Sequence, residues 1–347
     1  MDETVKPKGA RATIKDVAIA AGVSPMTVSN VLNGRMQFVS PTTKKRVERE
    51  IGRLNYRRSA NARNLRISEQ RSIGMVIVDE SPFFLADHFT CQVVAGLANV
   101  LNGADYTLTV QGMRGDQVGG SMIMRNFEVG GFCAMISGLP SARRAVIEQL
   151  SGLDQPVVVF QEALDKVRPD FCVVRQDDKG GGKLLADHLL ARRVESYLVV
   201  VPRQGWPAVE NRVAGLREGL GGSNPPVGIT VVECASESFA DVQAATARYL
   251  DHHSLPGAIV GANDQIAAAA MLHALDRGLR VPEDVRVVGF NGFEAHRYAR
   301  PRLTTVISSP YAIGEQAGKA MLRRLAAGSF DAPEYIVPVV FDPNSTT

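Results

Sequence analysis

The sequence predicts an α/β protein in which a small, basic, three-helix module precedes a larger body of parallel sheets in two lobes. Three observations support this fold class. The chain has 347 residues, of which 45% are apolar, and this length exceeds what one hydrophobic core usually serves. Short apolar runs alternate with helical patterns after residue 70. The positive charge is concentrated before residue 68.

The charge distribution separates the two parts of the chain. Residues 1–67 contain 14 Lys and Arg against 5 Asp and Glu, a net charge of +9. The chain as a whole has 39 basic and 36 acidic residues, so residues 68–347 have 25 against 31 and a net charge of −6. A basic run is more often a solvated face than a nucleic-acid footprint, so the local helix pattern has to decide its role.

The stretch "TIKDVAIAAG" predicts a first short helix. Thr13 is placed as its N-cap, and Asp16 follows at the capping-box spacing. Gly22 ends the helix. Its inner face consists of the apolar residues Val17, Ala18 and Ala21.

The stretch "SPMTVSNVLNG" predicts a second helix between Ser24 as N-cap and Gly34 as terminator, with Pro25 in the first helical position. Its apolar face holds Val28, Val31 and Leu32. Its other face is uncharged and consists of Met26, Thr27, Ser29, Asn30 and Asn33. Two short helices joined by a glycine turn form a helix-turn-helix, whose second helix enters the DNA major groove. The alternative is a helical hairpin that packs on another protein.

A third helix is expected after Ser40 and Pro41, so three helices close a small core in residues 1–57. Its inner face holds Val47, Ile51 and Leu54, and its outer face holds Lys44, Lys45, Arg46, Arg49 and Arg53. In double-stranded DNA, hydroxyls and amides of the second helix would meet base edges, while Lys and Arg would neutralise phosphates.

Nine apolar runs predict parallel strands linked by helices, enough for two lobes. These runs are "SIGMVIVD", "YTLTVQG", "GFCAMISG", "QPVVVFQ", "DFCVVRQD", "SYLVVVP", "ITVVECA", "PGAIVGAND" and "VRVVGFN". Ligands of open parallel sheets bind beyond the carboxyl ends of the strands. These ends are "DESPFF" at Asp79–Phe84, Gln111, Ser137, Gln161, "QDD" at Gln176–Asp178, "PRQGWP" at Pro202–Pro207, "AND" at Ala262–Asp264 and "FNGF" at Phe290–Phe293. The candidates chosen among them are Phe84, Gln111, Ser137, Asp177, Trp206, Asn263 and Asn291. Amides, hydroxyls, a carboxylate and an aromatic ring suit a polyhydroxy ligand. Ser137 and Asp177 equally fit the alternative role of helix caps.

Several function classes are not expected. Cys91, Cys133, Cys172 and Cys234 lie far apart, which favours reduced core residues over a metal or redox site. The chain shows neither a membrane-length apolar run nor the apolar stretch of a signal peptide at "MDETVKPKGAR", so we expect a cytoplasmic protein without a membrane partner.

Catalysis is not expected either, and neither a cofactor nor a metal is predicted. The segment "GGGK" at Gly180–Lys183 differs from a phosphate loop, because Leu184 stands where Ser or Thr would hold magnesium. No Ser-His-Asp constellation can be assembled from the sequence.

The chain resembles the LacI family of bacterial transcriptional regulators. The resemblance rests on "ATIKDVAIAAGVSPMTVSNVLNG", on "VSPTTKKRVEREIGRLNYRRSANARNLR" and on "RLTTV" at Arg302–Val306. It implies a periplasmic-binding-protein-like body in residues 71–347, in which the chain crosses between the lobes three times. We expect one lobe at about 71–174 with 303–335, and the other at about 175–302 with 336–347.

The resemblance also implies a hinge helix in residues 58–70, with Ala62, Arg63 and Leu65 in its motif and Leu65 as a minor-groove wedge. The expected DNA contacts are Thr13, Ser24, Pro25, Met26, Thr27, Ser29, Asn30, Asn33, Ser40, Arg63 and Leu65. The sequence departs from the family pattern at three positions: the family usually has Arg at Asn30, Pro at Arg58 and an apolar residue at Asn61.

For the effector, the resemblance assigns Arg212 and Asn263 to the pocket and places Asn291 where sugar-binding members carry Asp. A carboxylate would repel an anion, whereas Asn291 would not, and Arg212 could pair with a carboxylate or phosphate. The segment "GFNGFEAHRYARPRLTTV" looks closer to the gluconate-repressor branch. A sugar acid is therefore the first expectation and a neutral sugar the second.

Together these features predict an allosteric, sequence-specific repressor that binds a palindromic operator and responds to a sugar or sugar-acid effector. The end "VVFDPNSTT" lacks a leucine heptad, so a homodimer is expected. The alternative is a cytosolic sugar-binding receptor without a DNA role. Deletion of residues 1–67 distinguishes the two, because only a regulator would lose its function.

Overall fold

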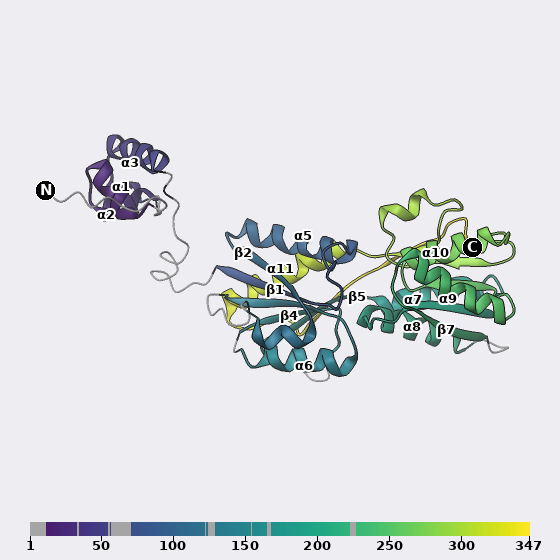
Figure 1. Ribbon diagram of the computed structural model, residues 1–347. Helices are drawn as coiled ribbons and strands as arrows, with labels where there is room; N and C mark the ends of the chain where they lie inside the picture. Colours follow the sequence, from purple (N-terminus) through teal and green to yellow (C-terminus); the bar gives the residue numbers. More distant parts are fainter. Residues whose placement is uncertain are drawn as a thin grey trace. The chain divides into compact units, whose positions relative to one another are not determined.

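The computed structural model describes residues 12–32, 35–54, 56, 71–121, 123, 129–153, 155–164, 168–222 and 227–347. The chain divides into two compact units, Met1–Gln70 and Arg71–Thr347, which we call the head and the body (Figure 1). In the described ranges, no helix is both long and apolar enough to cross a membrane.

The head contains α1 (Ile14–Ala21), α2 (Pro25–Leu32), a 3-10 turn η1 (Met36–Phe38) and α3 (Pro41–Arg53). The three predicted helices are confirmed, and so are the N-caps Thr13, Ser24 and Ser40 and the end of α1 at Gly22, whereas Gly34 lies outside the described residues. The Thr13 hydroxyl accepts from the Asp16 amide while Asp16 accepts from the Thr13 amide. The Ser24 hydroxyl accepts from the Thr27 amide at 3.1 Å, and the Ser40 hydroxyl accepts from the Thr43 amide at 3.2 Å.

The core of the head is small and apolar, and consists of Val17, Ala18, Ala21, Val28, Val31 and Val47. A buried carboxylate lies beside it. Glu50 is only 6% exposed and pairs with Arg53 at 2.5 Å and with Arg49 at 3.3 Å. Two of the basic residues expected on the outer face of α3 are therefore engaged with Glu50.

The first lobe of the body is a six-stranded parallel sheet in the order β11-β5-β4-β3-β1-β2. Helices α5 and α11 cover one face and α6 covers the other (Figure 1). The element bounds are β1 (Ser72–Val78), α5 (His88–Gly103), β2 (Thr107–Met113), η2 (Gly115–Gly120), β3 (Gly131–Ile136), α6 (Pro140–Ser151), β4 (Val157–Phe160), β5 (Phe171–Gln176), α11 (Pro310–Ala327) and β11 (Glu334–Val337).

The second lobe is a four-stranded parallel sheet in the order β7-β6-β8-β9. Helices α7 and α8 pack on one face, and α9 and α10 on the other. The element bounds are α7 (Asp178–Leu190), β6 (Ser196–Pro202), α8 (Pro207–Leu220), β7 (Gly228–Cys234), α9 (Phe239–His252), β8 (Ala258–Gly261), α10 (Asp264–Asp276), β9 (Arg286–Val288), η3 (Glu294–Tyr298), β10 (Thr305–Ile307) and β12 (Val340–Asp342). Strands β10 and β12 form a separate antiparallel pair.

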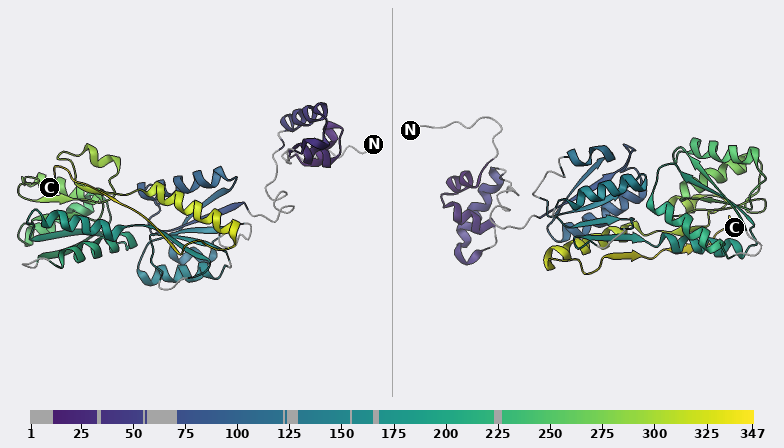
Figure 2. Two further views of the ribbon diagram at one scale, coloured as in Figure 1. Left: turned by 180° about the vertical axis from the view of Figure 1, so that it is seen from behind. Right: turned by 90° about the horizontal axis from the view of Figure 1, so that it is seen from below.

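All nine predicted strands are present, as β1 to β9. The chain passes between the lobes after β5, after β10 and after β11 (Figure 2). The expected second crossing at 302/303 was placed too early. Residues 303–307 belong to the second lobe, because Leu303 and Val306 are buried in its two clusters and the Gly289 amide donates to the Thr304 carbonyl.

Helices α7 and α8 approach each other closely through two glycines. A Cβ atom on Gly182 would lie 2.2 Å from the carbonyl oxygen of Arg212, and one on Gly215 would lie 2.0 Å from the carbonyl oxygen of Lys179. Gly96 and Gly314 play the same reciprocal part between α5 and α11, against the carbonyls of Tyr311 and Val93. The segment "GGGK" is therefore a helix-packing element.

Candidate functional site

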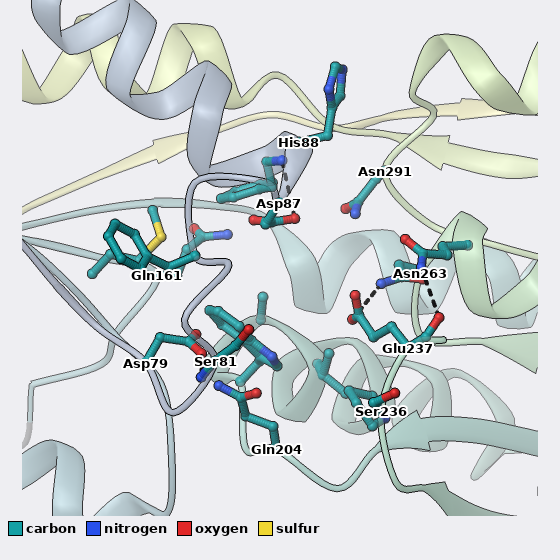
Figure 3. A pocket seen from close by; sticks show the side chains of 18 of the residues that line it. Asp79, Ser81, Asp87, His88, Gln161, Gln204, Ser236, Glu237, Asn263 and Asn291 are labelled. Atoms are coloured by element: carbon teal, nitrogen blue, oxygen red, sulfur yellow. Dashed lines mark hydrogen bonds between the residues drawn. The ribbon is translucent and has the colours of Figure 1, made fainter. Parts of the chain in front are cut away.

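A cavity of about 430 Å³ lies between the two lobes of the body, within the range of small-molecule sites. Polar groups from both lobes line it at the carboxyl ends of parallel strands, as the sheet topology requires (Figure 3). The first lobe contributes Asp79, Ser81, Phe84, Asp87, His88 and Gln161. The second contributes Gln204, Trp206, Arg212, Glu237, Asn263, Asp264, Asn291 and Phe293.

The Arg212 guanidinium is the best-anchored group of the cavity lining. It is 8% exposed and stacks on the Phe290 ring, 3.9 Å from the ring centroid. Its Nε donates to Asp178 Oδ1 at 2.8 Å, Nη1 to the Ala262 carbonyl at 2.7 Å, and Nη2 to Asn291 Oδ1 at 2.9 Å. Three of its five N–H donors are thus engaged within the protein.

Asp178, the carboxylate that pairs with Arg212, is 2% exposed and ties the lobes together. Gln176 donates to its Oδ1 at 2.7 Å, and Gln161 from the first lobe donates to Oδ2 at 3.3 Å. Burial raises the pKa of Asp178, although Arg212 opposes the shift. Removal of either partner would leave the other as an uncompensated buried charge.

Four carboxylates line the cavity itself, two on each lobe. Asp79 accepts from the Ser81 amide at 2.7 Å, and Asp87 caps α5 by accepting from the Thr90 amide at 2.8 Å. Across the cavity, Glu237 accepts from the Asn263 side chain at 2.7 Å. Asp264 accepts from the Gly292 amide and from the Thr305 hydroxyl. Burial, and then the charge of Asp87, raise the pKa of Glu237.

Two asparagines hold the second-lobe side of the cavity in shape. Asn263 caps α10 by accepting from the Ile266 amide at 2.9 Å. Asn291 adopts a φ of 106°, a backbone conformation that few residues other than glycine tolerate. Its amide donates to the Val306 carbonyl of β10, and its carbonyl accepts from the amide of Ser308, just after β10, which fixes the strained conformation.

Contacts on two sides of the cavity join the lobes directly. On one side, Arg143 of α6 donates to both carboxylate oxygens of Glu210 on α8, at 3.1 and 2.9 Å, and the Gly138 amide donates to the Gly205 carbonyl at 2.7 Å. On the other side, the His88 and Phe293 rings meet edge to face at 4.6 Å. We call these contacts the interlobe contacts.

Comparison with known proteins assigns the family. A model described as "Bacterial regulatory proteins, lacI family" matches residues 13–59, and one described as "Periplasmic binding protein-like domain" matches residues 186–346. The HTH-type transcriptional repressor PurR of Aliivibrio fischeri is 30% identical over 323 residues, which cover 90% of this chain and 92% of that protein. The chain belongs to the lacI family of bacterial regulatory proteins. It is therefore a DNA-binding transcriptional regulator.

Two further likenesses extend over nearly the whole regulator. The ribose operon repressor of Bacillus subtilis is 28% identical over 338 residues, covering 97% of this chain and 98% of that protein. The crystal structure of the lac repressor dimer bound to operator superposes with a TM-score of 0.82 at 24% identity, covering 97% of this chain and 99% of that one. The expected fold class is confirmed for the head and the body, while the predicted hinge helix in residues 58–70 lies outside the described residues.

Five of the predicted effector residues of the regulator line the cavity, and three do not. Phe84, Trp206, Arg212, Asn263 and Asn291 come together there. Gln111 instead accepts from the Ile123 amide at 3.3 Å, and Ser137 donates to the Val78 carbonyl at 3.0 Å. Asp177 caps α7 by accepting from the Gly180 amide at 2.9 Å. The capping alternative is confirmed for Asp177 and wrong for Ser137, because α6 begins after Leu139 without a side-chain cap. Asp178, the neighbour of Asp177, supplies the buried carboxylate.

Among the lining residues of the regulator's cavity that the sequence did not predict are two carboxylates, Asp87 and Glu237. Asp87 lies nine positions beyond the end of β1, at the start of a helix, and Glu237 lies in the loop between β7 and α9. Neither directly follows a strand, so the ends of the apolar runs do not indicate either residue. The N-cap spacing of Asp87 before Thr90 was the one available signal.

The structure places the predicted DNA-contact residues of the regulator as follows. On α2, Pro25 and Met26 are exposed, Met26 at 63%, and Thr27, Ser29 and Asn30 are half-buried. Thr13, Ser24 and Ser40 are helix caps with exposed side chains. Asn33, Arg63 and Leu65 lie outside the described residues, as do Arg58, Asn61 and Ala62.

Proposed function

We propose that the regulator is a repressor that binds a palindromic operator as a homodimer, and that a small polyhydroxy effector in the interlobe cavity controls this binding. The observation that carries the proposal is the presence, in one chain, of a capped helix-turn-helix and of a cavity lined by both lobes. A ligand that contacts both lobes stabilises one arrangement of them, and a change in that arrangement reaches the head.

The names of similar proteins support this proposal. PurR and the ribose operon repressor are transcriptional repressors, and the lac repressor structure holds a dimer on operator DNA. For the proposed effector, the Arg212 ion pair with Asp178 removes the main reason to prefer a sugar acid. The carboxylates of the cavity lining favour a sugar without negative charge.

Specific DNA binding by the full chain tests the proposal. If the dimer places about 6 to 10 basic side chains on phosphates, log affinity should fall with log salt concentration at a slope of about −5 to −10. Fluorescence anisotropy with a labelled operator measures the slope. A slope near zero would contradict the proposal.

The base preference at Asn30 is a second expected result. An Asn side chain that reaches the groove pairs with adenine N6 and N7, whereas Arg pairs with guanine O6 and N7, each worth about 1–3 kcal/mol of discrimination. We therefore expect A·T at the base pair facing Asn30 in the wild-type operator and G·C after Asn30→Arg. Selection of sites from random DNA with both proteins measures this preference. An unchanged preference would show that Asn30 does not read that base pair.

A further inference from the structure

The residues that line the cavity carry an excess of negative charge. Arg212 is the only Lys or Arg among the described residues that line the cavity, and Asp178 directly behind it matches its charge. Asp79, Asp87, Glu237 and Asp264 add four carboxylates from four different segments. A site of this kind repels anions and attracts cations.

Three of these carboxylates line the cavity from opposite lobes. Asp79 and Asp87 lie on the first lobe and Glu237 on the second, as Figure 3 shows. Within the described ranges, none of the three takes part in an ion pair with Lys or Arg. Asp87 accepts backbone bonds at both carboxylate oxygens, whereas the described donors reach only one oxygen each of Asp79 and Glu237. These two carboxylates therefore retain acceptor capacity for a ligand.

The rings beside these carboxylates fit a cation as well. Phe84, Trp206 and Phe293 line the same cavity, and aromatic faces attract ammonium groups while they also stack on the apolar faces of sugar rings. A metal ion is a poor fit, because in the described part of the chain no three His, Cys, Asp or Glu side chains are grouped closely enough to hold one.

We propose that the effector is a polyhydroxy compound that carries a protonated amine, such as an amino sugar, with the ammonium group between Asp79 and Glu237. This inference rests on the proposed function and names the ligand class of that site. The ammonium donates hydrogen bonds to carboxylates of both lobes, so its binding replaces their mutual repulsion with attraction. The hydroxyls are left to Gln161, Gln204 and Asn291.

Matched probes that share a six-carbon skeleton test the inference on the full-length chain. Glucosamine, galactosamine and mannosamine carry the ammonium, glucose and N-acetylglucosamine are neutral, and gluconate is an anion. Calorimetry in phosphate buffer measures their affinities, because Tris is itself an amine with hydroxyl groups. At least one amino sugar should bind at least about tenfold more tightly than its neutral counterparts, the ratio expected from one charged hydrogen bond, and gluconate should bind more weakly still.

A charge-neutral variant locates the ammonium group. Glu237→Gln keeps the shape of the side chain and should lower the affinity for the amino sugar about tenfold. The affinity for glucose, which is already lower in the wild type, should change little. Glu233→Gln, on the exposed part of β7, is the matched control and should bind like the wild type.

Equal or tighter binding of glucose or gluconate overturns the inference, and so does the failure of all three amino sugars to bind. Neither result bears on the proposed function, which is measured separately by specific operator binding of the full chain, both without a sugar and with each sugar probe. Absence of specific operator binding in every one of these states contradicts the proposed function.

Discussion

The Arg212→Ala substitution is expected to lower the free energy of unfolding of the body by about 3–5 kcal/mol. It removes three hydrogen bonds and leaves the Asp178 carboxylate buried without its cation. Trp206, the only tryptophan, lies directly before α8 in the same lobe, so its fluorescence during urea unfolding reports the loss.

A second substitution distinguishes two causes of this loss of stability, the unpaired buried charge of Asp178 and the loss of the packing of the Arg212 side chain. Asp178→Asn in the Arg212→Ala background removes the unpaired carboxylate and should restore part of the stability. If the double variant is no more stable than Arg212→Ala, the unpaired charge is not the cause of the loss.

The pH dependence of the Arg212→Ala variant follows from the same carboxylate. Burial raises the pKa of Asp178, and removal of Arg212 takes away the attraction that opposes this shift. A carboxyl group whose pKa is higher in the folded state binds more protons there, so stability falls as pH rises from about 3.9 to the folded pKa. The deficit of the variant should therefore shrink as the pH is lowered from about 7 to 5, and Asp178→Asn should abolish this trend.

The Gly215→Ala substitution should destabilise the second lobe by about 3 kcal/mol, the upper end of the usual cost of overpacking. The added methyl group would lie 2.0 Å from the Lys179 carbonyl oxygen and 2.8 Å from its carbon, and these backbone atoms cannot turn away. Urea unfolding followed by Trp206 fluorescence measures the effect. Because α7 and α8 carry Asp178 and Arg212, a forced separation should also weaken ligand binding.

Gly222→Ala is the matched control for this substitution. Gly222 follows the end of α8, is exposed, and would bring its Cβ within 4 Å of no other atom. We expect a change close to zero. Equal losses from both substitutions would show that the close approach of α7 and α8 is not responsible.

Local signals made most of the fold predictable. Thr13, Ser24 and Ser40 cap their helices as their spacing indicates, and each of the nine apolar runs predicted as strands forms one. The strands β10, β11 and β12 lie outside the nine apolar runs. Their partners lie far away in the sequence, so the second crossing between the lobes could not be located from local pattern.

The candidate site was less predictable because a polar residue after a strand can either cap the next helix or turn toward the site. Asp177 and Asp178 are adjacent, and only the exact start of α7 decides which one caps the helix and which one turns inward to Arg212. The anionic character of the cavity arises when loops of two lobes come together, since Asp87 and Glu237 are 150 positions apart in the sequence. Only the folded structure brings such distant carboxylates into the lining of one cavity.

The interlobe contacts bear on how fast a ligand exchanges. Arg143 with Glu210, Gly138 with Gly205, and His88 with Phe293 already hold the lobes together around the cavity. Separation of the lobes has to break a charged bidentate pair and a ring contact first, so opening has an activation barrier of its own. Where opening is slower than diffusion, residence time follows the interlobe contacts rather than the contacts of the ligand. In that regime the opening step sets the delay with which the regulator responds to its effector.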